Sequence, residues 1–157
     1  MHLIVDSREP YWVREKFKTM ADAYNDLTVS VESLKTGDFL SEYFVIERKT
    51  VDDFISSFTQ PKKRVDGSVY HRLSEQTNRM LLMDQPLKVF LVVGDLGMAR
   101  SRVNAHSFNG QLAKLSALGF SVIFLGKCDD WFDYVYRLGR MCEKYTRIGV
   151  PLSNEKK

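Results

Sequence analysis

Cysteine and histidine are scarce in this sequence. Its 157 residues include two cysteines and three histidines. Neither Cys128 nor Cys142 has a metal-ligand spacing such as Cys-x2-Cys, which excludes a zinc site of that kind and favours reduced thiols in an intracellular protein. The histidines also lack ligand spacing, and no Ser-His-Asp or Cys-His arrangement is evident. Hydrolysis by an activated serine or cysteine is therefore not indicated.

Long apolar runs, repeats and low-complexity segments are also missing. No apolar stretch approaches the ~18 residues that cross a membrane, and the N-terminus enters a predicted strand without a signal-peptide pattern. The segment Gly94-Asp95-Leu96-Gly97 follows a buried apolar run but lacks the Gly-x-Gly-x-x-Gly order of a dinucleotide-binding turn. We therefore expect a soluble cytoplasmic protein with no membrane contact and no nucleotide cofactor.

The composition that is present predicts one globular domain with a weak basic excess. A hydrophobic content of 44% and an aromatic content of 12% supply one well-buried core, and the length is short for two. The net charge of +3 suits a polyanionic partner without requiring one. We expect a single domain over residues 1–150, followed by a polar tail over residues 151–157.

Hydrophobic patterning predicts an α/β fold, in which a central mixed β-sheet is flanked by helices on both faces. Alternating or continuous apolar runs predict strands over residues 2–6, 27–32, 39–40, 43–49, 89–93 and 120–125. Apolar residues at helical spacing predict helices over residues 10–24, from 50 onward, and over 68–84, 99–118 and 131–145. The short connections between residues 27 and 49 predict antiparallel neighbours there.

The stretch from Gly37 to Asp53 carries the densest group of candidate site residues. It reads Gly-Asp, eight mostly apolar residues, Glu-Arg-Lys, three further residues and Asp. Side chains alternate along a strand, so Glu47 and Lys49 are expected on one face and Arg48 on the other. Two carboxylates and an ammonium can hold a hard divalent cation and place a water for attack on a phosphodiester. The alternative is a solvated strand end.

The order Gly-Asp-x8-Glu-Arg-Lys-x3-Asp resembles the signature of the XPF/Hef family of structure-specific DNA endonucleases. The segment from Val5 to Glu9, which reads Val-Asp-Ser-Arg-Glu, is similar to that family's first strand and turn. The resemblance covers Leu3 to about Tyr145 and implies a restriction-endonuclease-like core. It also implies metal-dependent hydrolysis of DNA near branch points such as flaps, forks or splayed arms, in repair, replication or recombination.

The resemblance assigns roles to four residues around one cation. Asp38 and Glu47 would bind Mg²⁺ or Mn²⁺, since Mg²⁺ needs only one or two carboxylates and keeps several waters. Lys49 would orient the attacking water or stabilise the charge that develops on phosphorus. Asp6 ends the first strand and would aid the metal. From the residues alone, an aspartate that only caps the following turn is equally consistent with this position.

Four further residues are expected to support that group. Arg48 points from the other strand face, and we expect it to anchor Asp53 or Asp6 by a charge-assisted bond. Asp53 stands where the third residue of a new helix would complete a capping box, and this structural role is compatible with support of the site. Arg8 and Glu9 are expected to extend the same network.

A polar, basic break over residues 60–67 predicts a loop. Its cations Lys62, Lys63 and Arg64 could contact DNA phosphates, with affinity that falls as salt rises, or could form a solvated surface. In the family an Arg-Leu-x-x-Gln helix start follows the last acid closely. Here Arg72 and Gln76 match that motif but arrive late, which indicates an insertion that holds the three cations. We count Arg72 and Gln76 with the DNA-binding residues.

The quaternary structure and the substrate remain open at this stage. The helix over residues 131–145 has an apolar stripe wider than one sheet face needs, which indicates either a homodimer or core packing alone. The tandem helix-hairpin-helix modules usual in the family are not in this sequence, so we expect a nuclease domain that stands alone. A non-catalytic DNA-binding or scaffold subunit is one alternative. A Holliday-junction resolvase or an exonuclease of the same fold is the other.

Overall fold

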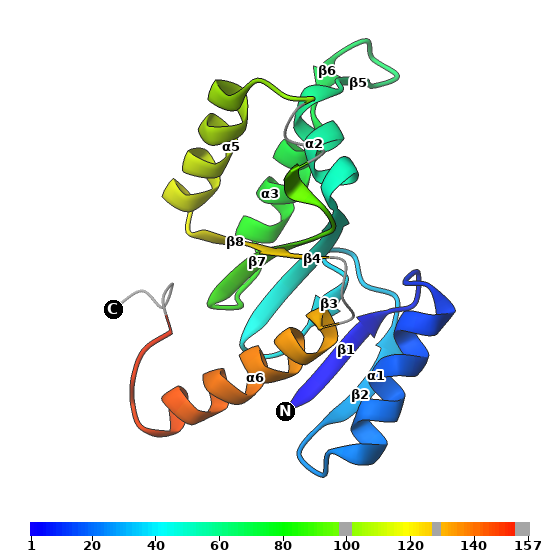
Figure 1. Ribbon diagram of the computed structural model, residues 1–157, viewed down its shortest axis with the longest axis vertical. Helices are drawn as coiled ribbons and strands as arrows, with labels where there is room; N and C mark the ends of the chain where they lie inside the picture. The colour runs from blue at the N-terminus through cyan, green and yellow to red at the C-terminus, as the bar shows by residue number, and fades with distance from the viewer. Residues whose placement is uncertain (98–101, 127–129, 153–157) are drawn as a thin grey trace.

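A mixed sheet of six strands runs through the molecule in the order β2-β1-β3-β4-β7-β8 (Figure 1). The strands β1, β2, β4, β7 and β8 pair in parallel within two groups, and β3 joins the groups by antiparallel pairing with β1 and β4. Their bounds are β1 His2–Asp6, β2 Thr28–Glu32, β3 Phe39–Leu40, β4 Phe44–Thr50, β7 Leu87–Val93 and β8 Phe120–Leu125. This computed structural model describes residues 1–97, 102–126 and 130–152.

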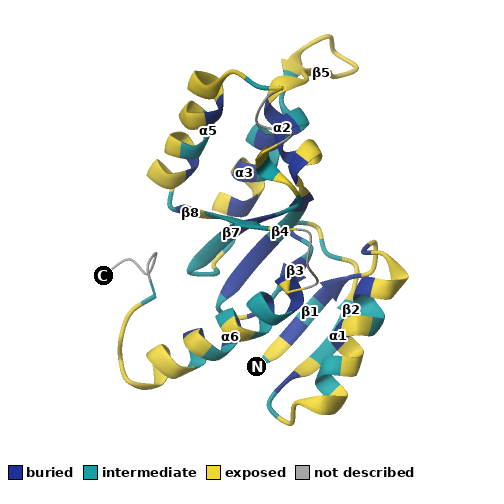
Figure 2. Ribbon diagram, in the orientation of Figure 1, coloured by how far each residue is buried: buried dark blue, intermediate teal, exposed yellow. Residues whose placement is uncertain are grey.

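Helices cover both faces of the sheet, which confirms the predicted α/β architecture. One face packs against α1 (Tyr11–Ala23) and α6 (Trp131–Arg147). The other packs against α2 (Val51–Thr59), α3 (Arg72–Leu81) and α5 (Ala105–Ala117). Figure 2 shows the buried residues on the central strands and on the helix faces turned toward them. The sheet therefore separates two hydrophobic clusters.

Strand β4 contributes side chains to both hydrophobic clusters, because successive side chains point to opposite faces of the sheet. Phe44 and Ile46 lie in the cluster under α1 and α6, whereas Val45 lies in the cluster under α2 and α3, and all three are fully buried. Four consecutive residues of β7 are also buried, as expected for a central parallel strand covered on both faces. This packing fixes the direction in which the next residues of β4, Glu47 to Lys49, must point.

The structure corrects three predicted boundaries. Residues 60–67 are not only a loop, because Lys62–Lys63 (β5) pairs with Val69–Tyr70 (β6) in a small hairpin. Val69 and Tyr70 belong to this hairpin, so the helix predicted over residues 68–84 begins only at Arg72. It ends at Leu81. The helix predicted from Ala99 begins, within the described residues, at Ala105, where the Asn104 side chain accepts a hydrogen bond from the backbone of His106.

Parts of three sequence predictions fall beyond what the structure describes. Ala99 lies outside the described residues, as does most of the tail predicted over 151–157, and Cys128 does too. Across the ranges that are described, no helix has both the length and the apolar character needed to cross a bilayer.

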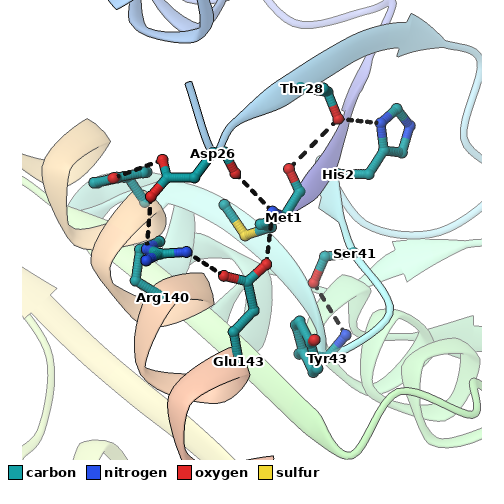
Figure 3. A network of polar contacts seen from close by, with 9 residues as sticks. Met1, His2, Asp26, Thr28, Ser41, Tyr43, Arg140 and Glu143 are labelled. Atoms are coloured by element: carbon teal, nitrogen blue, oxygen red, sulfur yellow. Dashed lines mark hydrogen bonds and ion pairs between the residues drawn. The ribbon is translucent and has the colours of Figure 1, made fainter. Parts of the chain in front are cut away.

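A polar network ties α6 to the start of the sheet (Figure 3). The amino group of Met1 donates to the carbonyl oxygen of Asp26 at 2.7 Å and pairs with the Glu143 carboxylate at 2.6 Å. Arg140 pairs with both acids, and the Tyr136 hydroxyl donates to Asp26. These contacts therefore hold the middle turns of α6 against the N-terminus and the segment that precedes β2.

Candidate active site

A glycine turn between β2 and β3 lies between the end of β1 and strand β4. Gly37 has φ +81°, and a Cβ atom there would lie 2.6 Å from the Val45 side chain, so a larger residue would have to displace the strand. The Asp38 amide donates to the Ile46 carbonyl oxygen, and the Asp38 carbonyl oxygen accepts from the Asp6 amide, each at 2.8 Å. The backbone therefore brings Asp6, Asp38 and the end of β4 together.

An open polar cavity of about 280 Å³ lies at this junction. Residues from the end of β1, the turn before β3, strand β4 and helix α3 line it. They include Asp6, Arg8, Glu9, Lys35, Asp38, Glu47, Gln76 and Arg79. The cavity thus collects carboxylates and cations from segments far apart in the sequence, as an active site on an α/β sheet would.

Asp38 and Glu47 are acids held in an environment that opposes their charge. Burial raises the pKa of Glu47 to about 7, and the nearby Asp38 carboxylate acts in the same direction. Burial also raises the pKa of Asp38, although a 2.8 Å hydrogen bond from the Arg48 amide to its carboxylate partly offsets this effect. Two carboxylates that repel each other in one cavity would both be stabilised by a cation between them.

Lys49 lies beside Glu47, as strand alternation predicts. Its Nζ is 3.7 Å from a Glu47 carboxylate oxygen, and its side chain is only 9% exposed. Burial lowers the pKa of Lys49, while Glu47 and Asp38 oppose that shift. The sheet therefore presents an acid and an amine side by side within a largely buried site.

Arg48 points to the opposite face and binds a residue that the sequence analysis did not assign to it. Its guanidinium donates two hydrogen bonds to Glu9, at 2.8 and 3.1 Å, and lies 5.2 Å from the ring centroid of Trp131. The prediction that Arg48 anchors Asp53 or Asp6 is wrong. The physical reason is the strand alternation itself, which sends Arg48 toward α1 and α6, whereas Asp53 belongs to α2 on the other face.

Asp6 is buried and its carboxylate is already occupied. One oxygen accepts from Arg8 Nε at 2.8 Å, and the other faces the backbone amides of Leu34 and Arg8 at 3.3 and 3.4 Å. Arg8 also donates to the Leu34 carbonyl oxygen at 2.6 Å. Asp6 therefore holds the turn after β1, beside the cavity, and Arg8 joins it as predicted. A part in metal binding stays a prediction.

Asp53 is the third residue of α2, as its sequence context predicts, and Thr50 is the N-cap. Its backbone amide donates to the Thr50 side chain at 3.1 Å at the start of α2. Asp53 lines a second cavity, with Asp52 and Arg72, instead of the cavity that holds Asp38. Its charge nevertheless favours the protonated form of Lys49, which is consistent with a supporting role.

Gln76 contacts Glu47 directly, a relation that the sequence analysis missed. Its amide nitrogen donates to a Glu47 carboxylate oxygen at 2.5 Å. Its own carbonyl oxygen is buried and accepts no hydrogen bond within the part of the chain that the structure describes. Arg79, one turn later, also lines the cavity and acts on the Glu47 charge. The signal available in the sequence was the i, i+3 spacing of Gln76 and Arg79 on one helix face.

The remaining predicted DNA-binding residues differ in their solvent exposure and in the contacts that they already make. Lys62 and Lys63 are exposed on β5. Arg64 pairs with Glu75 and lies 4.4 Å from the ring centroid of Tyr70, which fastens the hairpin to α3. Arg72 is half-buried and donates to the Ser56 hydroxyl at 3.1 Å. Contact of these residues with DNA stays a prediction.

The donor atoms at the cavity suit a hard cation with a partial water shell. Within the described residues there is no cluster of three or more His, Cys, Asp or Glu side chains that could hold a metal ion. The described residues therefore do not indicate a zinc or calcium ion held by protein ligands alone, since such sites need four or more ligands. Two carboxylates, supplied here by Asp38 and Glu47, fit Mg²⁺ or Mn²⁺, for which water fills the other positions.

Comparison with known proteins gives a family and two similar structures. The sequence matches the ERCC4 domain family over residues 5–138. The fold is similar to that of XPF from Aeropyrum pernix, with a TM-score of 0.66 and 20% identity, over 94% of this chain and 68% of that one. XPF from Aeropyrum pernix in complex with DNA gives 0.62 and 22%, over 91% of this chain and 65% of that one. No curated protein matched the sequence.

The ERCC4 domain match and the two XPF structures confirm the resemblance to XPF-type nucleases that was carried by residues 4–9 and 37–53. At 20% and 22% identity the two structures establish a shared fold, which confirms the predicted α/β fold with a central mixed sheet. This chain spans about two thirds of each of them. The family match covers 134 of the 157 residues, from 5 to 138. The chain therefore belongs to the ERCC4 domain family.

Proposed function

We propose that this protein is a divalent-metal-dependent DNA endonuclease. One observation carries the proposal: Asp38 and Glu47, both largely buried, share one cavity, and the Lys49 ammonium lies 3.7 Å from Glu47. Burying two carboxylates and an ammonium together costs desolvation free energy that the stability of the fold does not require. Such groups typically mark a functional site. Membership of the ERCC4 domain family supports DNA as the substrate.

Asp38 and Glu47 would hold Mg²⁺ or Mn²⁺ through their carboxylate oxygens. When bound, such an ion polarises the scissile phosphate and lowers the pKa of a bound water. Asp38 is prepared for this role because the Arg48 amide fixes one of its oxygens. Lys49 would donate a hydrogen bond to the attacking water or to a phosphate oxygen, where its charge opposes the negative charge of the transition state.

Gln76 would position Glu47 from helix α3. Its amide donates to the Glu47 carboxylate, and its unpartnered carbonyl oxygen can accept a hydrogen bond from a water in the cavity. Partners of metal-binding carboxylates orient them, and their loss costs about 10- to 100-fold in metal affinity or activity. Gln76 would thus act through Glu47 and through water, in addition to the DNA contact predicted from the sequence.

The substitution Gln76→Met is expected to lower kcat by about 10- to 100-fold, because it removes both hydrogen-bonding groups and keeps the side-chain length. Single-turnover cleavage of labelled DNA measures this effect, and Mn²⁺ affinity measured without DNA should fall in parallel. Asn78→Met makes a comparable change at an exposed position of the same helix and should leave both values unaltered. Equal rates for Gln76→Met and the parent would remove Gln76 from the site.

The preferred substrate in this proposal is branched DNA, such as a flap, fork or splayed arm. Support comes from the hairpin of β5 and β6, which presents Lys62 and Lys63 to solvent near α3, the helix that reaches the cavity. Exposed cations can hold a DNA segment by its phosphates. A homodimer through α6 also belongs to the proposal, because Met141 and Tyr145 expose apolar surface there.

A panel of labelled DNAs tests the function and its alternatives. Flap, fork, bubble, four-way junction and linear duplex substrates are incubated with Mg²⁺ or Mn²⁺, and with EDTA as the control. The proposal expects internal cuts near a branch that require the cation. Loss of nucleotides from ends only would indicate an exonuclease, and cleavage confined to the four-way junction would indicate a resolvase. Binding without cleavage of any substrate would indicate a scaffold subunit and would overturn the proposal.

A further inference from the structure

Two large aromatic side chains are exposed side by side at the start of α1. Tyr11 is 69% exposed and Trp12 is 55% exposed, whereas the other tryptophan, Trp131, is 3% exposed. They are the first two residues of the helix, directly after Pro10. Adjacent exposed aromatics of this size mark interaction surfaces, because they gain by leaving water.

This aromatic pair lies close to the proposed active site. Glu9 lines the cavity, and consecutive Cα atoms are about 3.8 Å apart, so the Cα atom of Tyr11 lies within about 7.6 Å of that of Glu9. Figure 1 shows the first turn of α1 beside the end of β1. Tyr11 and Trp12 therefore follow, two and three residues later, a residue that lines the cavity.

Trp12 is held by a chain of rings that begins at Arg48, which lies between Glu47 and Lys49 on β4. The Arg48 guanidinium lies 5.2 Å from the Trp131 ring centroid, and Trp131 stacks on Phe132 at 3.7 Å. Phe132 in turn meets Trp12 edge to face at 5.9 Å. One part of the Trp12 ring is thus fixed against α6 while the rest faces water. An aromatic ring held in this way loses little conformational entropy when a ligand stacks on it.

The charges around the pair favour an anionic partner. The Arg8 side chain is 68% exposed, and Lys16 is exposed on the first two turns of α1. Arg14 lies 5.9 Å from the Tyr11 ring centroid, and its Nε is buried without a hydrogen-bond partner in the described part of the chain. A ligand that offers both flat rings and negative charge, as single-stranded nucleic acid does, matches these residues.

We propose that Tyr11 and Trp12 form a stacking platform for unpaired bases of a DNA strand that runs through the active site. The proposal rests on the assigned nuclease function and adds a requirement to it. Bases in a duplex are covered by their neighbours, so only a single-stranded arm can stack on protein rings. The platform would therefore select DNA that is unpaired next to the cleaved bond, such as a splayed arm.

Intrinsic fluorescence tests the platform without any cleavage. The protein is titrated in EDTA with oligothymidylate of ~12 nucleotides, and separately with a duplex of equal length. Stacking on Trp12 should quench tryptophan emission in a saturable way with the single strand and much less with the duplex, because Trp131 is buried. Trp12→Phe should abolish the quenching but keep binding, measured by anisotropy of a labelled strand.

Substitution to alanine then measures the contribution to affinity. Trp12→Ala is expected to weaken single-strand binding about tenfold, the loss of one base stack, and Tyr11→Ala should have a similar effect. Tyr24→Ala removes an exposed aromatic at the other end of α1 and is the matched control with no expected change. Thermal unfolding of each variant checks that the fold is retained.

Three outcomes would overturn the platform. Emission of Trp12 could remain constant upon saturation with the single strand, or Trp12→Ala could bind it as tightly as the parent. The variant could instead dissociate a dimer without changing DNA affinity, which would assign the rings to contact between two copies of the chain. Quenching by the single strand, together with no cleavage of any DNA, would support the platform and reject the nuclease function, so the two proposals fail separately.

Discussion

The substitutions Asp38→Asn and Lys49→Ala are expected to abolish DNA cleavage while folding and DNA binding persist. Asp38→Asn removes one of the two carboxylates proposed to hold the cation, and Lys49→Ala removes the ammonium near the reacting phosphate. Loss of one group that stabilises transition-state charge typically costs about 10²- to 10³-fold in kcat. Single-turnover cleavage of a splayed-arm substrate in Mg²⁺ measures the rate, and anisotropy with labelled DNA measures binding.

Asp52 provides a control for these variants because it is an acid of the same sequence region outside the cavity. Its side chain is 75% exposed and pairs with Arg102. Asp52→Asn should therefore cleave at the parental rate. If either Asp38→Asn or Lys49→Ala also did so, the assigned roles would be wrong.

The metal-free protein is expected to lose stability as pH rises, and this loss should come largely from Glu47. Its pKa is about 7 in the folded state, raised chiefly by burial and then by Asp38, against 4.5 as the ordinary value. A group with a raised folded pKa contributes fully below pH ~4.5 and loses that contribution as pH rises through 7. The difference corresponds to on the order of 3 kcal/mol in the free energy of unfolding.

Urea unfolding in EDTA at a series of pH values measures this dependence. The variant Glu47→Gln has no charge to bury, so its stability should fall less between pH 5 and 8 than that of the parent. Added Mg²⁺ should stabilise the parent above pH 7 and have little effect on the variant, since a cation relieves the repulsion between Asp38 and Glu47. Identical pH profiles for the two proteins would show that Glu47 ionises normally.

The hydrophobic pattern was sufficient to predict the sheet and its helices. Phe44, Val45 and Ile46 are fully buried and alternate between two clusters, so the pattern also fixed the faces of Glu47, Arg48 and Lys49. The hairpin of β5 and β6 was missed because each strand has two residues, too few to show a period. Its pairing also moved the start of α3, which the sequence placed too early.

The site was predictable where it depends on local order along the chain. The relation of Glu47 to Lys49 follows from a two-residue period, and the cap at Asp53 follows from Thr50 three residues earlier. Partners that come from distant segments were not predictable. Arg48 donates to Glu9, which is 39 positions away in the sequence, and no local pattern predicts that these two side chains pair.

Gln76 shows the same limit within the proposed active site. Its motif position indicated importance, but the bond to Glu47 across 29 positions depends on how α3 packs on the sheet. The sequence therefore placed Gln76 among DNA contacts, whereas the geometry adds a role in orienting an acid. Tertiary packing decides such roles, because each contact joins two elements whose separate patterns say nothing about their angle.

Anomalous diffraction from crystals grown with Mn²⁺ tests most directly whether Asp38 and Glu47 form a cation site. We predict one strong anomalous peak in the cavity, bound by a carboxylate oxygen of each residue, with Lys49 beside it and Gln76 still on Glu47. The peak should disappear in Asp38→Asn crystals grown under the same conditions. A peak at another place, or none in the cavity at Mn²⁺ concentrations that support cleavage, would contradict the account.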